Sequence, residues 1–325
     1  MFTGVIPSRR ATLPVLALFT SAVVAGCGTS APATGPAAEG FPMSISSCGR
    51  EVTFDAPPQR VVTVGSIAAP LIAAAGAGDR IVTRTFEAAS FPGEYGEELQ
   101  NIEITAPTAE LAREEIINRS PDLVVSVEGL SVTPDDLAQV NIPLIVTRGY
   151  CRDAAGTFED VFADIALYGK LFGTASAADA EVAALQRRVD AVTSRHPVGA
   201  TRTPAAALIL SRDGAQLKAY GAKSTVDSQM KILGLDNIYG GIDKRNFEAN
   251  TETLIARDPE VIILLTQGDQ TPDSVRTALR QRPELAGLRA IRDNRMIVAP
   301  FGYTGPGPVA VEGLEVLDRE LASLR

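Results

Sequence analysis

Arginines and aromatic residues that follow predicted strands are the side chains in this sequence best suited to hold a ligand. A guanidinium group makes paired, charge-assisted hydrogen bonds to carboxylates, phosphates or the oxygen atoms around a chelated metal. Aromatic rings supply flat apolar walls for a pocket. Each residue alone could equally be a surface arginine or a packed aromatic, but their recurrence at strand ends and adjacent connections predicts one site for an anionic small molecule. The predicted ligand-binding residues are Ser66, Arg84, Phe86, Arg148, Tyr150, Arg212, Tyr220, Arg245, Asn246, Phe247 and Tyr303.

Catalysis has little support in the sequence. The one histidine, His196, precedes Pro197 in a connector, so a serine–histidine–acid triad would depend on it alone. No Gly-x-Ser-x-Gly turn, no phosphate-binding glycine loop and no dinucleotide-binding glycine pattern is present. A two-histidine site is impossible, and the three cysteines form no metal-ligand cluster. We therefore expect a binding protein rather than an enzyme, with no catalytic residue, no metal site and no cofactor of its own.

Length and charge narrow the class further. A chain of 325 residues with 45% hydrophobic residues can bury a large core and is expected to form two domains. Its formal net charge is −9, and the only charges before Cys27 are Arg9 and Arg10, so the remainder is more acidic still. Because nucleic-acid binding requires a basic stripe, we expect no nucleic-acid partner.

A stretch that occurs twice predicts the architecture. Residues 114–125 and 252–263 both read as acid, any residue, two aliphatics, any residue, Arg, any residue, Pro, acid and three aliphatics. The proline ends a helix, and the aliphatic run suits a strand buried on both faces of a parallel sheet. Recurrence after roughly 140 residues predicts two α/β lobes of similar build, although helix–Pro–Asp–strand junctions also arise by chance.

The rest of the chain alternates strands with helices, as parallel α/β lobes do. We predict an N-terminal lobe over 46–154, an inter-lobe helix over 155–175 and a C-terminal lobe over 176–325. The inter-lobe helix begins at Thr157 and Asp160, which match a capping box, and ends at Gly173. Elsewhere we predict strands over 48–54, 60–64, 81–83, 205–210 and 216–220, a long loop over 91–106 and a closing helix over 311–324.

The N-terminus is predicted to be an export signal. Arg9 and Arg10 precede an apolar run over 13–24 that is too short to span a bilayer and has the length of a signal-peptide core. The run ends in residues 24–27, Val-Ala-Gly-Cys, which resemble the bacterial lipobox, whose cysteine becomes the lipidated first residue after cleavage. We expect a signal peptide over 1–26, then lipidated Cys27 and a flexible tether over 27–45, on the outer face of the cytoplasmic membrane. Twin-arginine export is an alternative, but the following residues fit an ordinary secretory signal better.

Export and lipidation leave two cysteines, Cys48 and Cys151. In an oxidising compartment they are expected to form a disulfide. It would close a loop of about 100 residues, for which the chain-entropy model gives roughly 4 to 5 kcal/mol. Such a bond would tie the first strand to the end of the first lobe; two buried free thiols are the alternative.

After Cys27 the chain resembles the lipid-anchored substrate-binding proteins of ABC importers for iron–siderophore complexes, cobalamin and haem. The most specific parts of the resemblance are residues 52–54, 58–62, 76–82, 293–297 and both copies of the repeat. It implies an α/β fold with two Rossmann-like lobes joined by one long rigid helix, here at 155–175. The ligand cleft would lie between the lobes, which would move little about their hinge.

The resemblance also implies partners. In this family one surface acid on each lobe docks onto basic residues of the membrane permease, and the matching positions are Glu114 and Glu252. The alternative is that these acids only favour the N-termini of their helices. The Cys48–Cys151 pair resembles a variant found in part of the family. We expect a monomeric receptor anchored to the membrane and working with an ABC-importer permease.

The residues favour one ligand class over others. An arginine-rich cleft without tryptophan is less like cobalamin binders, and no placed histidine supports histidine-ligated haem, although tyrosine could ligate iron. An intact ferric siderophore complex, often anionic, suits arginine and tyrosine best; haem, cobalamin or another anionic small molecule are alternatives. A non-transport envelope interaction protein, whose cleft no longer binds solute, and an exported enzyme are the rival functions.

Overall fold

The computed structural model describes residues 39–87, 93–106, 111–197, 199 and 201–324. Residues 37–325 belong to one compact unit. The predicted signal peptide, Cys27 and the first part of the predicted tether lie outside the described residues. Within those residues, no helix is long and apolar enough to cross a membrane, and no group of three or more histidine, cysteine or acidic side chains could hold a metal ion.

The first described element is an antiparallel hairpin of β1 (Met43–Ser47) and β2 (Arg50–Phe54). Its turn consists of Cys48 and Gly49, at φ 47° and 83°, and two-residue turns with positive φ match the twist of paired strands. Ile45 on β1 is buried in the main hydrophobic core. The predicted tether over 27–45 is therefore too long at its C-terminal end, because its last residues pair with β2 and bury an isoleucine.

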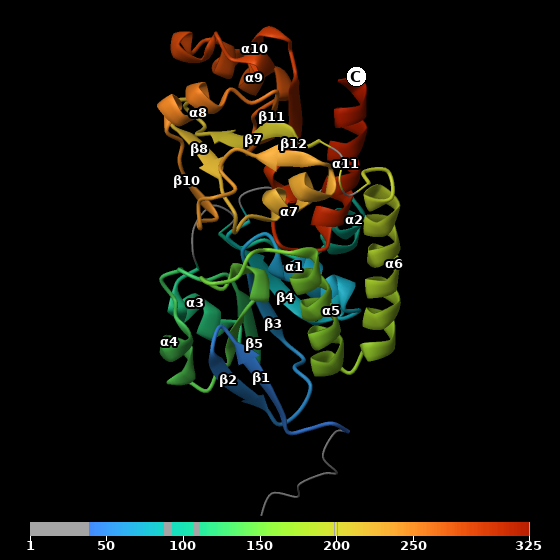
Figure 1. The fold of residues 1–325 in the computed structure, drawn as a ribbon. Coiled ribbons are helices and arrows are strands. Elements are labelled where there is room, and N and C mark those ends of the chain that lie inside the picture. Colours follow the sequence, from blue (N-terminus) through green and yellow to red (C-terminus); the bar gives the residue numbers. More distant parts are fainter. Residues whose placement is uncertain (1–38, 88–92, 107–110, 198, 200, 325) are drawn as a thin grey trace, which may run out of the picture. The chain divides into compact units, whose positions relative to one another are not determined.

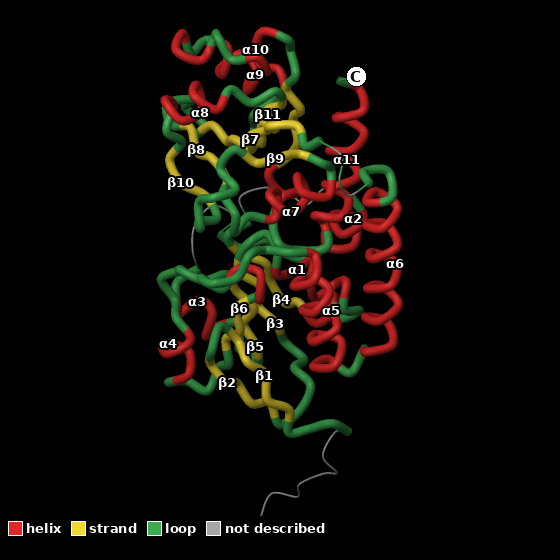
Figure 2. Tube along the Cα trace, in the orientation of Figure 1, coloured by secondary structure: helices red, strands yellow, loops and turns green. Residues whose placement is uncertain are grey.

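The N-terminal lobe is built on a parallel sheet with strand order β4-β3-β5-β6; Figures 1 and 2 show the lobe, and Figure 2 labels all four strands. Both faces of the sheet are covered: on β3, Val61 packs into the main core, whereas its neighbour Val62 packs into a second cluster on the other face. Burial on both faces explains the unbroken aliphatic runs of these strands. The strands and helices of this lobe are β3 (Val61–Val64), α1 (Ala68–Ala74), η1 (Gly78–Arg80), β4 (Ile81–Thr85), α2 (Glu94–Leu99), α3 (Arg113–Asn118), β5 (Leu123–Ser126), α4 (Pro134–Ala138), β6 (Leu144–Val146) and η2 (Arg148–Tyr150).

Helix α2 corrects one prediction, since it occupies part of the loop predicted over 91–106. Its Tyr95 and Leu99 are buried, while Glu94, Glu97 and Glu98 lie on its exposed side. A helix of this length has only two buried apolar positions. Because polar residues separate these two positions, the sequence shows no clear helical periodicity of apolar residues here.

Two long helices follow, α5 (Phe158–Phe172) and α6 (Ala175–Thr193), and lie side by side (Figure 1). The predicted capping box at the start of α5 is present, because Thr157 Oγ1 accepts from Asp160 N and the Asp160 carboxylate accepts from Thr157 N. Gly173 ends α5 in the left-handed region at φ 74°. The helix predicted over 157–173 is confirmed.

The assignment of this helix as the sole link between the lobes needs revision. Helix α5 packs along α1 of the N-terminal lobe. Helix α6 packs along α5 and also along α11, which belongs to the C-terminal lobe. Gly169 permits the close approach of α5 and α6, since a Cβ there would lie 2.3 Å from the Cβ of Ala178. On α6, Arg188 pairs with Glu94 of α2 at 3.1 Å and with Glu315 of α11 at 2.9 Å. We therefore assign the link to α5 and α6 together, with α6 as the helix that reaches the second lobe.

The C-terminal lobe has a mixed sheet of strand order β10-β8-β7-β11-β12, with β9 paired to β7 (Figure 2). β7, β9, β11 and β12 are parallel, and β8 and β10 are antiparallel to their neighbours. The predicted strands over 205–210 and 216–220 form the β7–β8 hairpin. The elements are β7 (Thr203–Leu210), β8 (Leu217–Tyr220), α7 (Thr225–Ile232), β9 (Leu235–Asn237), β10 (Asn246–Glu248), α8 (Thr251–Arg257), β11 (Val261–Thr266), α9 (Pro272–Arg280), η3 (Pro283–Leu285), α10 (Arg289–Arg292), β12 (Met296–Pro300), η4 (Phe301–Thr304) and α11 (Val309–Ser323).

The repeated stretch forms the same unit in both lobes. Its first copy is α3 followed by β5, and its second copy is α8 followed by β11. In each copy the residue before the proline has positive φ, at 47° for Ser120 and 39° for Asp258. This left-handed residue turns the chain from the helix into the sheet. The predicted helix–turn–strand repeat is confirmed.

Candidate functional site

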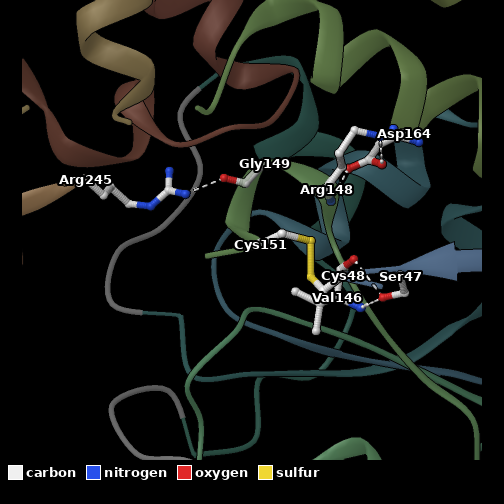
Figure 3. Close-up of a disulfide and its surroundings, with 8 residues drawn as sticks. All are labelled: Ser47, Cys48, Val146, Arg148, Gly149, Cys151, Asp164 and Arg245. Atoms are coloured by element: carbon white, nitrogen blue, oxygen red, sulfur yellow. Dashed lines mark hydrogen bonds and ion pairs between the residues drawn. A yellow bond between two sulfur atoms is a disulfide. The ribbon is translucent and has the colours of Figure 1, made fainter. Parts of the chain in front are cut away.

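Arg245, directly before β10, makes the central contact between the two lobes. Its Nη2 donates a hydrogen bond to the carbonyl oxygen of Gly149 in η2 (Figure 3). Its guanidinium carbon lies 4.8 Å from the centre of the Tyr150 ring, within the range of a cation–π contact. Two of the predicted ligand-binding residues therefore meet at the junction of the lobes, although 95 residues or so separate them in the chain.

The charge of Arg245 is only partly compensated. Burial lowers the pKa of its guanidinium, while the nearby Tyr150 and Glu128 act in the opposite direction. Its Nη1 is buried and has no hydrogen-bond partner among the described residues. A buried donor without an acceptor is unfavourable by about 1 to 3 kcal/mol, and more when it is charged. This donor is therefore available to an acceptor atom from outside the described residues.

Two tyrosines share this junction. Burial raises the pKa of Tyr150, an effect that Arg245 partly offsets. Burial also raises the pKa of Tyr220, and the proximity of Tyr150 raises it further. Both phenols therefore stay neutral over the physiological range and can donate a hydrogen bond or present a ring face. Tyr150, Tyr220 and Arg245 are the predicted residues that the structure brings together.

Two glycines allow the lobes to approach at this point. A Cβ on Gly149 would lie 2.4 Å from the Cβ of Pro306. A Cβ on Gly156 would lie 2.5 Å from Thr225 Oγ1 and 3.2 Å from Arg245 Nη1. Thr225 Oγ1 is itself buried without a hydrogen-bond partner among the described residues. Sequence reasoning missed these glycines and Thr225, since only the distant chain segments packed against them give them a role.

A cavity of about 310 Å³ lies in the N-terminal lobe. Its lining includes residues 127–130, which directly follow β5, and Leu144 and Val146 of β6. Glu128, which acts on the pKa of Arg245, is one of its lining residues, and all of them come from the N-terminal lobe. The cavity combines an apolar floor with charged side chains at Arg50, Glu128 and Arg152; the floor includes Val127, Leu130, Val132, Leu144 and Val146.

Three predicted residues of the N-terminal lobe lie elsewhere. Arg84 is 5% exposed and pairs with the buried Glu87 at 3.0 Å inside the lobe, so it is not presented to a ligand at the junction. Phe86 packs against the second hydrophobic cluster of this lobe. Ser66 is half-buried between β3 and α1. Ser66 and Phe86 follow strands as predicted, whereas Arg84 lies within β4, because this strand continues to Thr85, two residues beyond its predicted end.

Arg148 lies next to the junction and is half exposed. Its backbone N donates to Asp164 Oδ2 at 2.8 Å, and its Nε lies 3.6 Å from Asp164 Oδ1 (Figure 3). Asp164 is on α5 and is only 3% exposed. Its position on the apolar face of the predicted helix, between Val161 and Tyr168, was a signal that sequence reasoning could have used.

The remaining predicted residues of the C-terminal lobe are divided among several places. Arg212 is exposed two residues beyond the end of β7, while Tyr220 lies opposite the middle of that strand, roughly 15 Å away along it. The Phe247 ring packs edge-on against Tyr239, 5.4 Å between centroids. Asn246 is exposed, and Tyr303 is buried with its hydroxyl donating to Glu312 at 2.9 Å. Arg212 and Tyr303 therefore have other positions and partners than Arg245, whereas Asn246 pairs with Tyr220 across β10 and β8.

The predicted docking acids and cysteines have the following positions. Glu114 and Glu252 are exposed in the first turns of α3 and α8, the equivalent helices of the two repeats. Cys48 and Cys151 form a disulfide in the structure, with their Cα atoms 5.3 Å apart. His196 lies far from these residues in the sequence, at the end of α6, where its Nε2 is 2.6 Å from Asp318 Oδ1.

Comparisons with known proteins agree with this architecture. The family profile "Periplasmic binding protein" matches residues 61–303. The solved structure of an ABC-type Fe3+-hydroxamate transport system from Saccharomonospora viridis is 33% identical, with a TM-score of 0.75, over 86% of this chain and 99% of that chain. A comparison with curated proteins finds no match.

Two further solved structures share the fold at lower identity. The periplasmic haem-binding protein of Roseiflexus sp. RS-1 is 23% identical, with a TM-score of 0.66, over 82% of this chain and 98% of that chain. The periplasmic vitamin B12-binding protein of Vibrio cholerae is 15% identical, with a TM-score of 0.64, over the same shares. The profile match over most of the chain, the two-lobed α/β fold and the 33% identity together show that this chain belongs to the periplasmic binding protein family, the solute receptors of ABC importers.

Proposed function

We propose that this protein captures an iron–siderophore complex outside the cytoplasm and delivers it to an ABC-importer permease. The observation that carries the proposal is Arg245, whose buried Nη1 has no partner among the described residues at the point where the lobes meet. An anionic chelate supplies the acceptor oxygen atoms that this guanidinium lacks.

The surroundings of Arg245 favour a chelate over a small inorganic anion. Tyr150 and Tyr220 add apolar ring surface at the junction, and the N-terminal lobe has a cavity of about 310 Å³ with an apolar floor. A large ligand with an anionic centre and apolar arms uses all three features. The relative from Saccharomonospora viridis, named for Fe3+-hydroxamate transport, supports the same ligand class.

Haem, cobalamin and other anionic small molecules are the alternatives within the same receptor function. Histidine-ligated haem has no support at the junction, because the single histidine pairs with Asp318 at the end of α6. Tyr150 and Tyr220 could instead ligate iron. A titration panel that includes haem and cobalamin separates these ligands.

Delivery requires a docking surface and a membrane anchor. For docking we propose Glu114 and Glu252, which project from equivalent helices of the two lobes. For anchoring we propose lipidation of Cys27, which lies outside the described residues. Export would place the Cys48–Cys151 disulfide in an oxidising compartment, where it persists.

The deciding experiment titrates the chain from residue 28 onward with ferric siderophores, haem and cobalamin. Tyrosine fluorescence and calorimetry are read together, because iron complexes absorb light. We expect saturable binding of one siderophore class and its loss in Arg245→Ala, with Arg212→Ala as the matched control because that arginine is exposed and outside the junction. Binding by no member of the panel, together with a protein partner captured by crosslinking in the envelope, would favour the interaction-protein function instead.

A further inference from the structure

The segment Arg148–Tyr150 is the part of the N-terminal lobe that contacts Arg245. It is too short to keep its conformation without contacts from other parts of the lobe. It contributes the Gly149 carbonyl oxygen and the Tyr150 ring to the junction. Its own backbone bonds are those of a single tight turn, Tyr150 N to Thr147 O at 2.9 Å and Cys151 N to Arg148 O at 3.0 Å. A short 3-10 turn has poor hydrogen-bond geometry and depends on its surroundings. Other parts of the lobe must therefore position it.

The β1–β2 hairpin holds the segment from both ends. Before it, Val146 N donates to Ser47 Oγ at 2.8 Å, and the same hydroxyl donates to Val146 O at 3.2 Å. After it, Cys151 is bonded to Cys48, the residue next to Ser47 (Figure 3). Ser47 and Cys48, which are adjacent in the hairpin, thus hold the chain on both sides of residues 148–150.

Asp164 holds the segment from the side of α5. Its carboxylate accepts from Arg148 N at 2.8 Å and lies 3.6 Å from Arg148 Nε. Burial raises the pKa of this carboxyl to about 7, although the contacts with Arg148 lower it. A buried carboxylate with a half-exposed partner is weak support for fold stability, and neutral replacements at such sites are often more stable. Stability therefore does not account for an acid at this position.

Asp164 and the disulfide also share one cavity, of about 260 Å³. Arg148 faces the Asp164 carboxyl from η2, and Asp160 and Tyr168 face it from α5. The β1–β2 side of the cavity contributes Ser46, Ser47, Cys48 and Gly49, which carry no charge. The two anchors therefore line one cavity together with Arg148 of the segment that they hold.

We propose that Asp164 and the Cys48–Cys151 disulfide are positioning elements that fix residues 148–150 against Arg245, so that ligand affinity depends on both. The inference rests on the proposed function. Asp164 touches no part of the junction directly and acts through Arg148, and the disulfide acts through Cys151. Ionised Asp164 holds both the backbone and the side chain of Arg148, whereas the protonated carboxyl retains only the backbone bond.

The first test needs no ligand. Hydrogen–deuterium exchange of peptides covering residues 147–152 is compared in the wild-type chain, in Asp164→Ala, in Asp164→Asn and in the double variant Cys48→Ser/Cys151→Ser. We expect exchange to be about tenfold faster in Asp164→Ala and in the double variant, and nearer wild type in Asp164→Asn, which keeps an acceptor for Arg148 N. Unchanged exchange in all three variants overturns the proposal.

The second test separates positioning from stability. The probe is the ferric complex of a trihydroxamate siderophore, and affinity is measured from pH 5.5 to pH 8. Wild-type affinity should fall about tenfold as pH drops through 7, while Asp164→Asn should show the wild type's low-pH affinity throughout. The same variant should be more stable than wild type at pH 8, so stability and affinity move in opposite directions. Asp293→Asn, which removes an exposed acid of the C-terminal lobe, is the matched control and should change neither.

Reduction provides an independent arm. A reductant should weaken probe binding by the wild-type chain and leave the cysteine double variant unchanged. Faster exchange in the variants with unaltered probe affinity contradicts the positioning role. If the wild-type chain binds neither this probe nor haem or cobalamin, the proposed function fails, and the exchange data still decide whether the two anchors hold the segment.

Discussion

Arg84 and Arg245 are both buried to some degree, one in each lobe, and their surroundings differ. Arg84 lies on β4 inside the N-terminal lobe and forms a 3.0 Å ion pair with Glu87, whose side chain is also buried. Arg245 lies before β10 at the junction of the lobes and has no ion pair among the described residues. Its neighbours there are a carbonyl oxygen and an aromatic ring.

The difference separates an arginine paired with an acid inside one lobe from an arginine that keeps an unused donor at the lobe junction. A buried arginine paired with an acid within its own lobe has its charge satisfied, and removing it leaves the acid unpaired. A buried arginine with an unused donor at a lobe junction can form charge-assisted hydrogen bonds with an anion that binds there. The partners of a guanidinium, more than its burial, indicate which role it has.

The largest effect is expected inside the N-terminal lobe. Arg84→Ala should lower the free energy of unfolding by about 3 to 5 kcal/mol at pH 8, because it leaves the Glu87 carboxylate buried without its partner. Burial raises the pKa of Glu87 to about 7, so the loss should shrink at pH 5, where the carboxyl is protonated. Urea unfolding at the two pH values measures both. Arg50→Ala, which removes an exposed partner of Asp135, should change stability by less than about 1 kcal/mol.

At the junction the effect should appear in binding. Arg245→Ala is expected to weaken a ferric siderophore by about 1.5 to 3 kcal/mol, roughly 10- to 100-fold, through the loss of charged hydrogen bonds. Its stability should stay near that of wild type, since its guanidinium donates to a carbonyl rather than a carboxylate. Calorimetric titration and urea unfolding of the same variant separate the two roles. The two roles would be reversed if folded Arg84→Ala bound the siderophore more weakly than wild type while Arg245→Ala bound it as tightly as wild type.

The pH dependence of stability should come from the N-terminal half. Glu87 and Asp164 both have pKa values raised to about 7 by burial. The folded state therefore holds protons that the unfolded state releases near pH 4, so stability should fall as pH rises from about 4 to 7, by about 3 kcal/mol per carboxyl. Glu87→Gln and Asp164→Asn should each flatten part of this slope in urea unfolding. A slope that survives both substitutions would assign it to other groups.

The smallest effect on the purified protein is expected at the docking acids. Glu114→Lys and Glu252→Lys reverse charges on exposed first turns of α3 and α8, away from Arg245. Affinity and stability should therefore remain within about 0.5 kcal/mol of wild type. Uptake by cells that carry the double variant should be lost, because both lobes then repel the permease. A drop in affinity would show that these acids belong to the ligand site rather than to docking.

Local patterns made most of the fold predictable. The capping box at Thr157 and the doubled stretch at 114–125 and 252–263 specify helix starts, helix ends and buried strands from residues close in sequence. Helix α2 escaped prediction because its apolar positions are few. The ligand site was harder. The strand-end rule selected Tyr150, Tyr220 and Arg245, which meet at the lobe junction, and also Arg84 and Tyr303, which pair within their own lobes.

By itself, the sequence determined the two-lobed α/β architecture, the repeat and the family, since helix caps, proline turns and aliphatic runs act over short distances. Only the tertiary structure showed that Arg245 reaches the other lobe while Arg84 pairs within its own. The Arg245–Gly149 contact joins residues 96 positions apart, and Gly156 gains its role from Thr225 and Arg245 on the other lobe. Contacts of this kind depend on how the lobes pack, and the residue types along the chain do not specify them.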